Sequence, residues 1–183
     1  TINIDSLNFY PMGKHADPAL FSKYLSPLRK GEAVGVISEA GCPAVADPGA
    51  DLVAIAQREG LRVVPLVGPS SILLAVMASG FNGQSFAFHG YLPIDASQRI
   101  KRLKQLEARA VAERQTQLFI ETPYRNAKLF SDICQACSPT TRLCVAAGLT
   151  TPQEYIRTRT LKEWKACGLP DLGKIPAIFL IYR

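Results

Sequence analysis

One stretch of sequence decides the fold class: Ala33-Val-Gly-Val-Ile-Ser-Glu-Ala-Gly-Cys-Pro-Ala-Val-Ala-Asp-Pro-Gly49. Its first six residues form a short apolar run with β-branched side chains, and the rest is rich in glycine, alanine and proline. This pattern predicts a buried parallel strand that ends in a loop. Residues 50–59 then repeat apolar side chains at helical spacing until Gly60, which predicts a helix.

The same order of elements repeats directly afterwards. Arg62-Val-Val-Pro-Leu66 predicts a second strand, and Gly68-Pro69 predicts a turn. Ser70 or Ser71 can then cap a helix over residues 72–78. Two successive units of strand, loop and helix indicate the α/β class, with a parallel sheet covered by helices.

The second half of the chain has a different character. Residues 95–114 predict a polar surface helix, with an apolar stripe at Leu103, Leu106 and Ala110 and with Arg99 among its charged side chains. Further strands are expected at residues 117–121, 142–146 and 177–182, and a helix at residues 127–136. We place the lobe boundary near residues 83–86, so that one lobe comprises residues 1–84 and the other residues 85–183.

Composition indicates a folded cytoplasmic protein. The chain has 183 residues, of which 48% are hydrophobic, enough for a core. No apolar run approaches the roughly 20 residues of a bilayer-spanning helix, and the first residues do not resemble a secretory signal. Five cysteines fit a reducing compartment. Cys134 and Cys137 have the spacing of a redox dithiol or half a zinc site, or they pack on one helix; we expect no metal.

The net charge of +6 is unevenly distributed along the chain. Residues 1–94 contain six Lys or Arg and seven Asp or Glu, a net charge of −1. Residues 95–183 contain fifteen and eight, a net charge of +7. A basic lobe can attract the phosphates of a nucleic acid, although many proteins carry such charge without a polyanionic partner.

Two loops are candidates for ligand binding because ligands of open α/β sheets bind at the carboxyl ends of the strands. They comprise residues 38–49 and 67–72, in which glycine permits a close approach of the main chain and proline restricts it. Both could also be ordinary turns between strand and helix. The sequence contains neither a phosphate loop nor a Gly-x-Gly-x-x-Gly motif, and no Gly-x-Ser-x-Gly elbow for hydrolysis.

Four motifs carry a resemblance to a known family. They are residues 37–49, residues 62–71, Phe88-His-Gly-Tyr-Leu-Pro93 and Phe119-Ile-Glu-Thr-Pro-Tyr-Arg125. In this order and spacing the chain resembles, over residues 33–183, the tetrapyrrole-methylase class, and within it the ribosomal RNA 2′-O-ribose methyltransferases. The resemblance implies a two-lobed fold with a parallel sheet in the first lobe and a mixed sheet in the second.

The resemblance also implies that S-adenosylmethionine binds in the cleft between the lobes of a homodimer. In this class the cofactor is held mostly by main-chain groups, and no catalytic residue is assigned here. Carried over by position, the implied cofactor-binding residues are Cys42, Pro43, Val45, Ser71, Ile72, Ile120, Glu121, Ala147, Pro176 and Ala177.

Three functions remain open at this stage. Methylation of RNA fits the first motif and the basic second half. Methylation of a tetrapyrrole precursor at carbon fits Thr150-Thr-Pro-Gln153. This segment is part of Ala146-Ala-Gly-Leu-Thr-Thr-Pro-Gln153, where the RNA branch usually has Arg-Glu-Leu-Thr-Lys. A non-catalytic module that binds cofactor or RNA is the third, because residues 1–30 lack the strand and Gly/Pro-rich loop with which the family begins. The chain is then incomplete or lacks one wall of the cleft.

Overall fold

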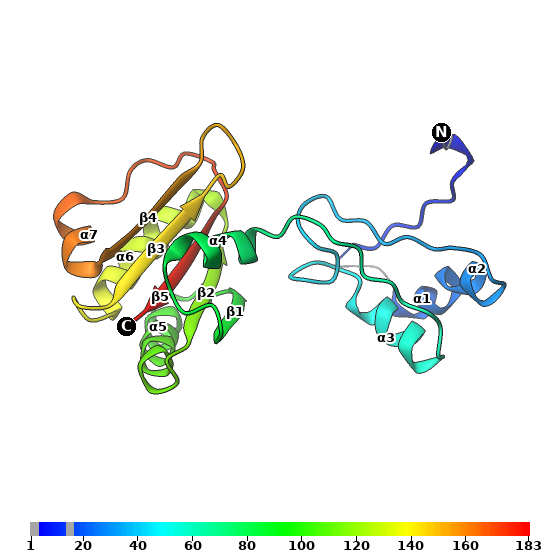
Figure 1. The fold of residues 1–183 in the computed structure, drawn as a ribbon, viewed down its shortest axis with the longest axis horizontal. Coiled ribbons are helices and arrows are strands. Elements are labelled where there is room, and N and C mark those ends of the chain that lie inside the picture. Colours follow the sequence, from blue (N-terminus) through cyan, green and yellow to red (C-terminus); the bar gives the residue numbers. More distant parts are fainter. Residues whose placement is uncertain (1–3, 14–16) are drawn as a thin grey trace. The chain divides into compact units, whose positions relative to one another are not determined.

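A computed structural model describes residues 4–13 and 17–183 (Figure 1). The chain divides into two compact units between Ser70 and Ser71. No helix in the described part of the chain combines the length and the apolar character needed to cross a bilayer. The predicted lobe boundary near residues 83–86 refers to the two lobes of the family fold and stays a prediction.

The first unit contains only helices and extended loops among its described residues. The helices are η1 (Ile4–Ser6), α1 (Pro18–Tyr24), α2 (Ser26–Arg29) and α3 (Ala50–Arg58). Helix α1 begins where the Asp17 carboxylate accepts a hydrogen bond from the Ala19 amide, at 2.9 Å. A small core forms between α1 and α3, from Phe21, Tyr24, Leu25, Leu52 and Ala56.

The two strands predicted for this unit are absent from its described residues, and with them the predicted parallel sheet. Residues 33–38 and 62–66 follow extended paths, but no backbone hydrogen bonds join them. Val36 and Val63 pack, partly buried, against the small core, whereas other apolar side chains stay largely in solvent, with Ile37 79% and Leu66 87% exposed. A strand needs a neighbouring backbone with which to exchange hydrogen bonds, and the apolar pattern specifies the need for a partner but does not supply one. The predicted helix at residues 50–59 is confirmed as α3.

The second unit is built on a five-stranded mixed sheet in the order β1-β2-β5-β3-β4. Strands β1 and β2 are parallel, and all other neighbours are antiparallel. The strands are β1 (Phe86–Tyr91), β2 (Thr116–Glu121), β3 (Arg142–Ala147), β4 (Tyr155–Thr160) and β5 (Ala177–Tyr182). The α/β class and the mixed sheet expected for the second lobe are therefore confirmed.

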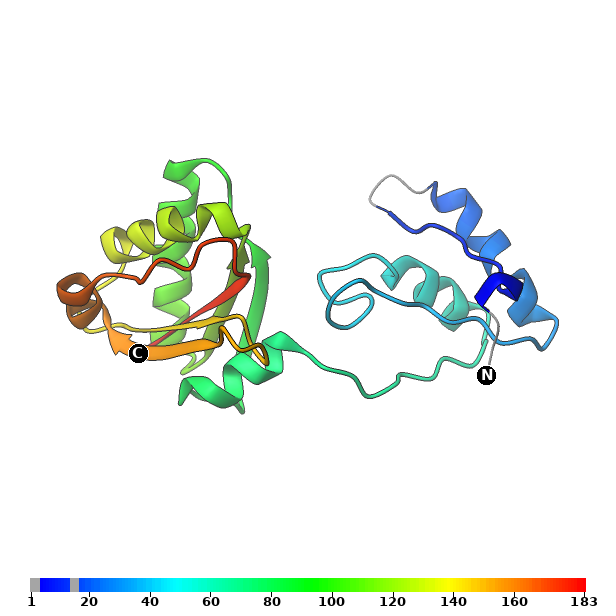
Figure 2. The same cartoon turned by 90° about the horizontal axis from the view of Figure 1, so that it is seen from above.

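Helices cover both faces of this sheet (Figure 2). One face packs against α5 (Ala96–Ala112), α6 (Asn126–Ala136) and α7 (Leu161–Cys167), and the other against α4 (Ser71–Ser79). A short helix η2 (Pro123–Arg125) leads into α6. Side chains alternate along each strand, so that Phe119 and Phe179 face the three helices while Leu118 and Leu180 face α4.

Arg99 does not lie on the surface as the sequence predicted. Its side chain is 6% exposed, and its guanidinium forms a salt bridge of 2.6 Å with Asp132 of α6. The same guanidinium donates hydrogen bonds to the carbonyls of Pro93 and Ile94. A charge can be buried here because every direction of the planar donor group meets an acceptor. Arg99 thus joins the β1–α5 turn to α6.

Candidate functional site

Five of the predicted cofactor residues lie together at one end of the second unit's sheet. Strand β2 ends at Glu121 and β3 ends at Ala147, and both pair with Ala177 at the start of the central strand β5. We call this group the strand-end row, and its members are Ile120, Glu121, Ala147, Pro176 and Ala177. The row places small side chains and main-chain groups from three neighbouring strands side by side.

The loop after β3 lies tightly against this row. The Gly148 amide donates a hydrogen bond of 3.0 Å to the Pro176 carbonyl. Gly148 has φ +57°, and a Cβ atom at this position would lie 3.1 Å from the side chains of Ile175 and Thr151. A larger residue would therefore be strained in its backbone and crowded by its neighbours, so glycine is required for the close approach.

The two predicted residues of α4, Ser71 and Ile72, lie toward the same end of the sheet. The other end of α4 is fixed near the middle of β3, because the Ser79 carbonyl accepts a hydrogen bond of 2.8 Å from Thr158, the residue paired with Cys144. A nine-residue helix extends about 13 Å, roughly the distance covered by four strand residues. Ile72 packs, partly buried, against the cluster on this face of the sheet.

Glu121 is the charged group of the row, and its side chain is 2% exposed. Its Oε1 accepts hydrogen bonds from Arg125 at 2.6 Å, from the Thr122 amide at 2.7 Å and from the Thr122 hydroxyl at 3.2 Å. All the hydrogen bonds that described residues donate to this carboxylate go to Oε1. The carboxylate is thus held in one orientation, with Oε2 as its remaining acceptor.

The remaining three predicted residues, Cys42, Pro43 and Val45, belong to the first unit. Their loop is tightly turned, with positive φ angles at Gly41, Ala44 and Ala46. The Cys42 thiol donates to the Pro69 carbonyl at 3.5 Å, so the two loops singled out by the sequence touch within this unit. The participation of these residues in one site with the strand-end row is part of the proposal below.

His89 forms an interaction that the sequence did not reveal. Its Nε2–H donates to the Gln117 side-chain oxygen at 2.7 Å, while Arg102 donates to its Nδ1 at 3.3 Å. Burial lowers the pKa of His89, with contributions from Arg102 and Arg109 against the opposing hydrogen bond to Gln117. The ring is therefore a neutral structural link between β1, β2 and α5. The other histidine, His15, lies outside the described residues.

Cys134 and Cys137 pack as small apolar side chains in the core beneath α6. Burial raises the pKa of Cys137 to about 12, with smaller contributions from Glu107 and Cys134. Burial likewise raises the pKa of Cys134. A protonated, buried thiol is a poor nucleophile and a poor metal ligand. Of the interpretations given above, packing on one helix therefore describes these two cysteines.

Residues 19–165 match the family model described as Tetrapyrrole (Corrin/Porphyrin) Methylases. The chain belongs to this family. Two curated relatives are each called ribosomal RNA small subunit methyltransferase I. The protein from Mesorhizobium japonicum is 39% identical over 140 residues, which are 76% of this chain and 46% of the relative. The protein from Pseudomonas aeruginosa is 36% identical, over 77% of this chain and 49% of the relative.

Solved structures support the tetrapyrrole methylase fold for this chain. The methyltransferase CobJ superposes with a TM-score of 0.64 at 18% identity, covering 100% of this chain and 78% of its own. The uroporphyrin-III-C-methyltransferase from Thermus thermophilus superposes with a TM-score of 0.53, covering 90% of this chain and 70% of its own. The chain spans about half the length of the curated relatives it matches.

Proposed function

We propose that this member of the tetrapyrrole methylase family is an S-adenosylmethionine-dependent methyltransferase. Its substrate is the ribose of ribosomal RNA. The observation that carries the proposal is the family match together with curated relatives that bear the name of a ribosomal RNA methyltransferase. The strand-end row supports it, because it presents main-chain groups where α/β folds bind ligands.

The described residues suit a cofactor that is held by the main chain. Ala147 and Ala177 leave little side chain over their backbones, and the Gly148 turn keeps that backbone next to Pro176. Glu121 Oε2 offers one fixed anionic acceptor for a hydroxyl or an amine. In the complete site, Ser71 and Ile72 would contribute from α4, and Cys42, Pro43 and Val45 from the first unit.

S-adenosylmethionine supplies an activated methyl group on a sulfonium, so the protein mainly has to align a nucleophile and exclude water. A ribose hydroxyl also needs a proton acceptor. Glu121 Oε1 is committed to Arg125 and Thr122, which favours a binding role for this carboxylate over a role as the base. The proposal therefore assigns binding residues and no catalytic base.

The partners follow from the same proposal. An RNA substrate would meet the second half of the chain, where the excess positive charge lies. A homodimer is proposed with it because the family resemblance of the sequence implies one. A cytoplasmic location is proposed because ribosomal RNA is cytoplasmic in bacteria such as those of the relatives.

A tetrapyrrole precursor is the second candidate substrate. Thr150-Thr-Pro-Gln153 favours it, and this segment forms the tight loop beside the row, where the Thr151 hydroxyl donates to the Gly148 carbonyl at 2.7 Å. The names of the curated relatives weigh for RNA. A module that binds without catalysis is the third candidate.

Calorimetry with S-adenosylmethionine tests the common part of these proposals. We expect binding heat for the wild-type chain, weaker binding for Glu121→Gln, and wild-type binding for Glu113→Gln, whose carboxylate pairs with Arg109 on the surface. Absence of heat and of thermal stabilisation in the wild-type chain would remove the cofactor proposal.

Transfer of labelled methyl groups then separates the substrates. We expect label in small-subunit ribosomal RNA taken from a strain that lacks the enzyme, and none in the same RNA from a normal strain, where the position is already methylated. Label in a porphyrinogen in place of RNA would establish the second candidate, and cofactor binding without transfer to either the third.

A further inference from the structure

At the opposite end of the second unit's sheet, Arg142 presents a guanidinium that no acceptor of the described residues engages. Strand β3 begins at Arg142 and ends at Ala147 in the strand-end row, a distance of about 17 Å along the strand. The Arg142 side chain is partly exposed, and it forms neither a salt bridge nor a hydrogen bond within the described part of the chain. A guanidinium carries five N–H donors, so Arg142 has donors to offer to a ligand.

Two aromatic rings hold this guanidinium in place. Its Cζ lies over the ring of Phe81, 5.1 Å from the ring centre, and over the ring of Tyr182, at 5.2 Å. The centres of the two rings are 5.6 Å apart. Stacking uses the flat face of a guanidinium and leaves the N–H groups at its edge for acceptors. We call Arg142, Phe81 and Tyr182 the Arg142 cluster.

Helix α4 links this cluster to the proposed cofactor residues. Ser71 and Ile72 form the start of α4, and Phe81 follows two residues after its end. Arg142 belongs to the α4 face of the sheet, because side chains alternate along β3 and Cys144, two residues further, packs on that face. The α4 face thus carries proposed cofactor residues at one end and the Arg142 cluster at the other.

Two more arginines have their main chain next to the Arg142 cluster. The Asn82 side chain, directly after Phe81, donates a hydrogen bond of 2.7 Å to the Arg114 carbonyl. Arg183 follows Tyr182 at the end of β5. Both arginines are exposed, and neither guanidinium has an acceptor among the residues that the structure describes. This end of the sheet therefore offers positive charge that is not used for ion pairs.

Acidic side chains at this end of the unit are already engaged by other groups. Glu107 accepts from the Thr141 hydroxyl, Glu113 pairs with Arg109, and Glu163 accepts from the Thr160 hydroxyl. These carboxylates contribute to the ends of α5 and α7 and do not pair with Arg142. An anion that approaches the Arg142 cluster therefore meets a guanidinium without a competing carboxylate bound to it.

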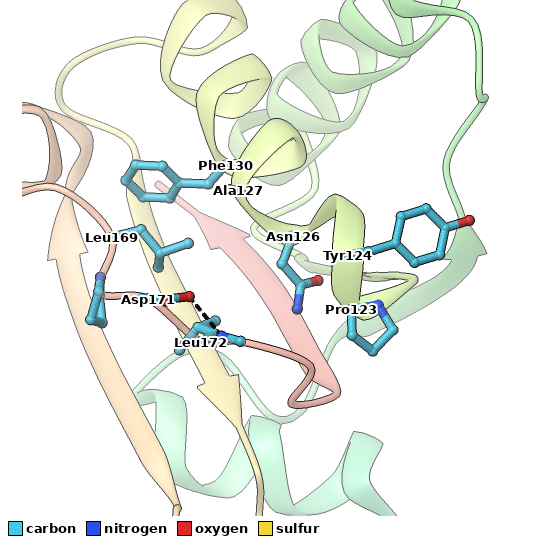
Figure 3. A pocket seen from close by; sticks show the side chains of 10 residues that line it. Pro123, Tyr124, Asn126, Ala127, Phe130, Leu169, Asp171 and Leu172 are labelled. Atoms are coloured by element: carbon cyan, nitrogen blue, oxygen red, sulfur yellow. Dashed lines mark hydrogen bonds between the residues drawn. The ribbon is translucent and has the colours of Figure 1, made fainter.

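A cavity on the other face of the sheet is a poorer place for an anion. It has a volume of about 460 Å³ and is lined by residues of 123–130 and 169–173. Figure 3 shows Asp171 in its wall, where the carboxylate accepts from the Gly173 amide at 2.8 Å. A carboxylate repels a phosphate, so the backbone of a nucleic acid is better placed at the Arg142 cluster.

We propose that the Arg142 cluster binds a phosphate of the RNA substrate. The edge of the guanidinium donates hydrogen bonds to two oxygens of one phosphodiester, while Phe81 and Tyr182 keep its plane fixed. Phosphates carry no sequence information, so the cluster adds affinity for RNA of any sequence. The proposal rests on the proposed function and assigns its RNA a contact about 17 Å from the strand-end row.

The test measures binding of fluorescently labelled oligouridine to the 183-residue chain at several salt concentrations. Arg142→Gln should weaken binding about tenfold, the effect of one charge-assisted hydrogen bond. It should also make the plot of log affinity against log salt concentration shallower by about 0.7, the contribution of one phosphate contact. The loss should be the same for oligoadenosine, and a loss confined to one of the two oligomers would replace the phosphate contact by recognition of a base.

Arg157→Gln is the matched control, because it removes the same charge from the same sheet. Arg157 is exposed on β4, and its guanidinium likewise has no ion-pair partner in the described chain. It pairs with Val145, whose side chain packs on the other face of the sheet. This variant should bind oligouridine as the wild type does. Equal losses in Arg142→Gln and Arg157→Gln would show attraction by the overall charge and would overturn the proposal.

Two further variants test the guanidinium and its stacking if Arg142→Gln fails to fold. Arg142→Lys keeps the charge but lacks the planar pair of donors, so the affinity should fall about threefold with an unchanged salt dependence. Tyr182→Leu removes one of the two stacked rings and should also weaken binding about threefold, whereas Tyr182→Phe keeps the ring and should bind normally. Wild-type affinity in both Arg142→Lys and Tyr182→Leu would contradict the proposal.

Methyl transfer separates this contact from the proposed function. Arg142→Gln should raise the KM for RNA about tenfold and leave kcat unchanged, because the contact lies far from the strand-end row and is made equally before and during the reaction. RNA binding that depends on Arg142 without any methyl transfer counts only against the enzyme. Methyl transfer to RNA with an unaltered RNA affinity in Arg142→Gln counts only against the Arg142 cluster.

Discussion

The two units of this chain contain similar apolar sequence and use it differently. In the second unit, apolar strands pair and bury residues such as Phe179 and Leu180 completely. In the first unit, extended segments of equal apolar character stay unpaired, and Val64 is 55% exposed. The difference teaches that a strand is a property of at least two segments, because its hydrogen bonds and its burial come from neighbours. The two units should therefore differ strongly in hydrogen-exchange protection and in how much a truncated side chain lowers the free energy of unfolding.

Hydrogen exchange should show the largest contrast. Amides of Val145 and Leu180 lie in central strands and should open only with global unfolding, which costs at least about 5 kcal/mol in typical domains. Amides of Val36 and Val64 are in unpaired segments and should exchange with opening free energies near zero. The measurement is exchange followed by NMR, and comparable protection in both groups would show that the first unit forms a sheet in solution.

Truncation of side chains should show the next largest contrast. Phe179→Ala removes a fully buried ring that stacks 6.4 Å from Phe119, and should lower the free energy of unfolding by about 4 kcal/mol. Val64→Ala removes half-exposed methyl groups and should change it by less than about 0.5 kcal/mol. Urea denaturation followed by circular dichroism measures both. A large effect of Val64→Ala would mean that its segment is buried in solution.

Within the second unit, a buried charge pair should contribute more to stability than an exposed one. Asp132→Asn leaves Arg99 buried without its counter-ion and should lower the free energy of unfolding by about 3 kcal/mol. Glu113→Gln breaks only an exposed pair and should leave the free energy of unfolding nearly unchanged. Burial acts to raise the pKa of Asp132, but hydrogen bonds from Lys128 and Arg99 hold that pKa below its usual value. This contribution to stability is therefore present above the ordinary Asp pKa and is lost as the pH falls below it. Denaturation of both variants from neutral to acidic pH checks the sign.

The smallest expected effect is at His89. Because its pKa is lowered in the folded chain, the unfolded chain binds the proton more readily, and stability should fall as the pH drops below the usual His pKa of 6.5. His89→Gln should flatten the dependence of the unfolding free energy on pH between 7 and 5. An unaltered slope would show that His89 titrates alike in both states.

Much of the second unit could be predicted from the sequence, because apolar runs there also have partners. Strands predicted at residues 117–121, 142–146 and 177–182 match β2, β3 and β5 within one residue. Strand β4 was missed because Tyr155–Thr160 alternates threonine with arginine at the edge of the sheet, where half-buried side chains give a weak apolar signal. Residues 62–66 have the apolar pattern of a strand, but no neighbouring segment exchanges backbone hydrogen bonds with them.

The sequence predicted some residues of the candidate site and missed others. The strand-end row was implied by family resemblance, and the register of three strands then brought its members together. Asn126 gave no signal, because its side-chain Nδ2 donates to the carbonyl of Ile175, 49 positions later in the sequence. Arg99 was misplaced for the same reason, since its acceptor on α6 is 33 residues away. Local patterns predict elements, but they do not predict which distant group completes a polar contact.

The guanidinium of Arg99 has a consequence for the order of assembly. It can leave water only when the β1–α5 turn and α6 are both present, because each supplies acceptors that the other lacks. If α5 packed on the sheet before α6, the Arg99 guanidinium would be buried in an apolar layer without the carboxylate of Asp132. We therefore expect these two helices to join the sheet in one cooperative step, so that the N-terminus of α6, with Asn126, becomes ordered together with the rest of the helical layer.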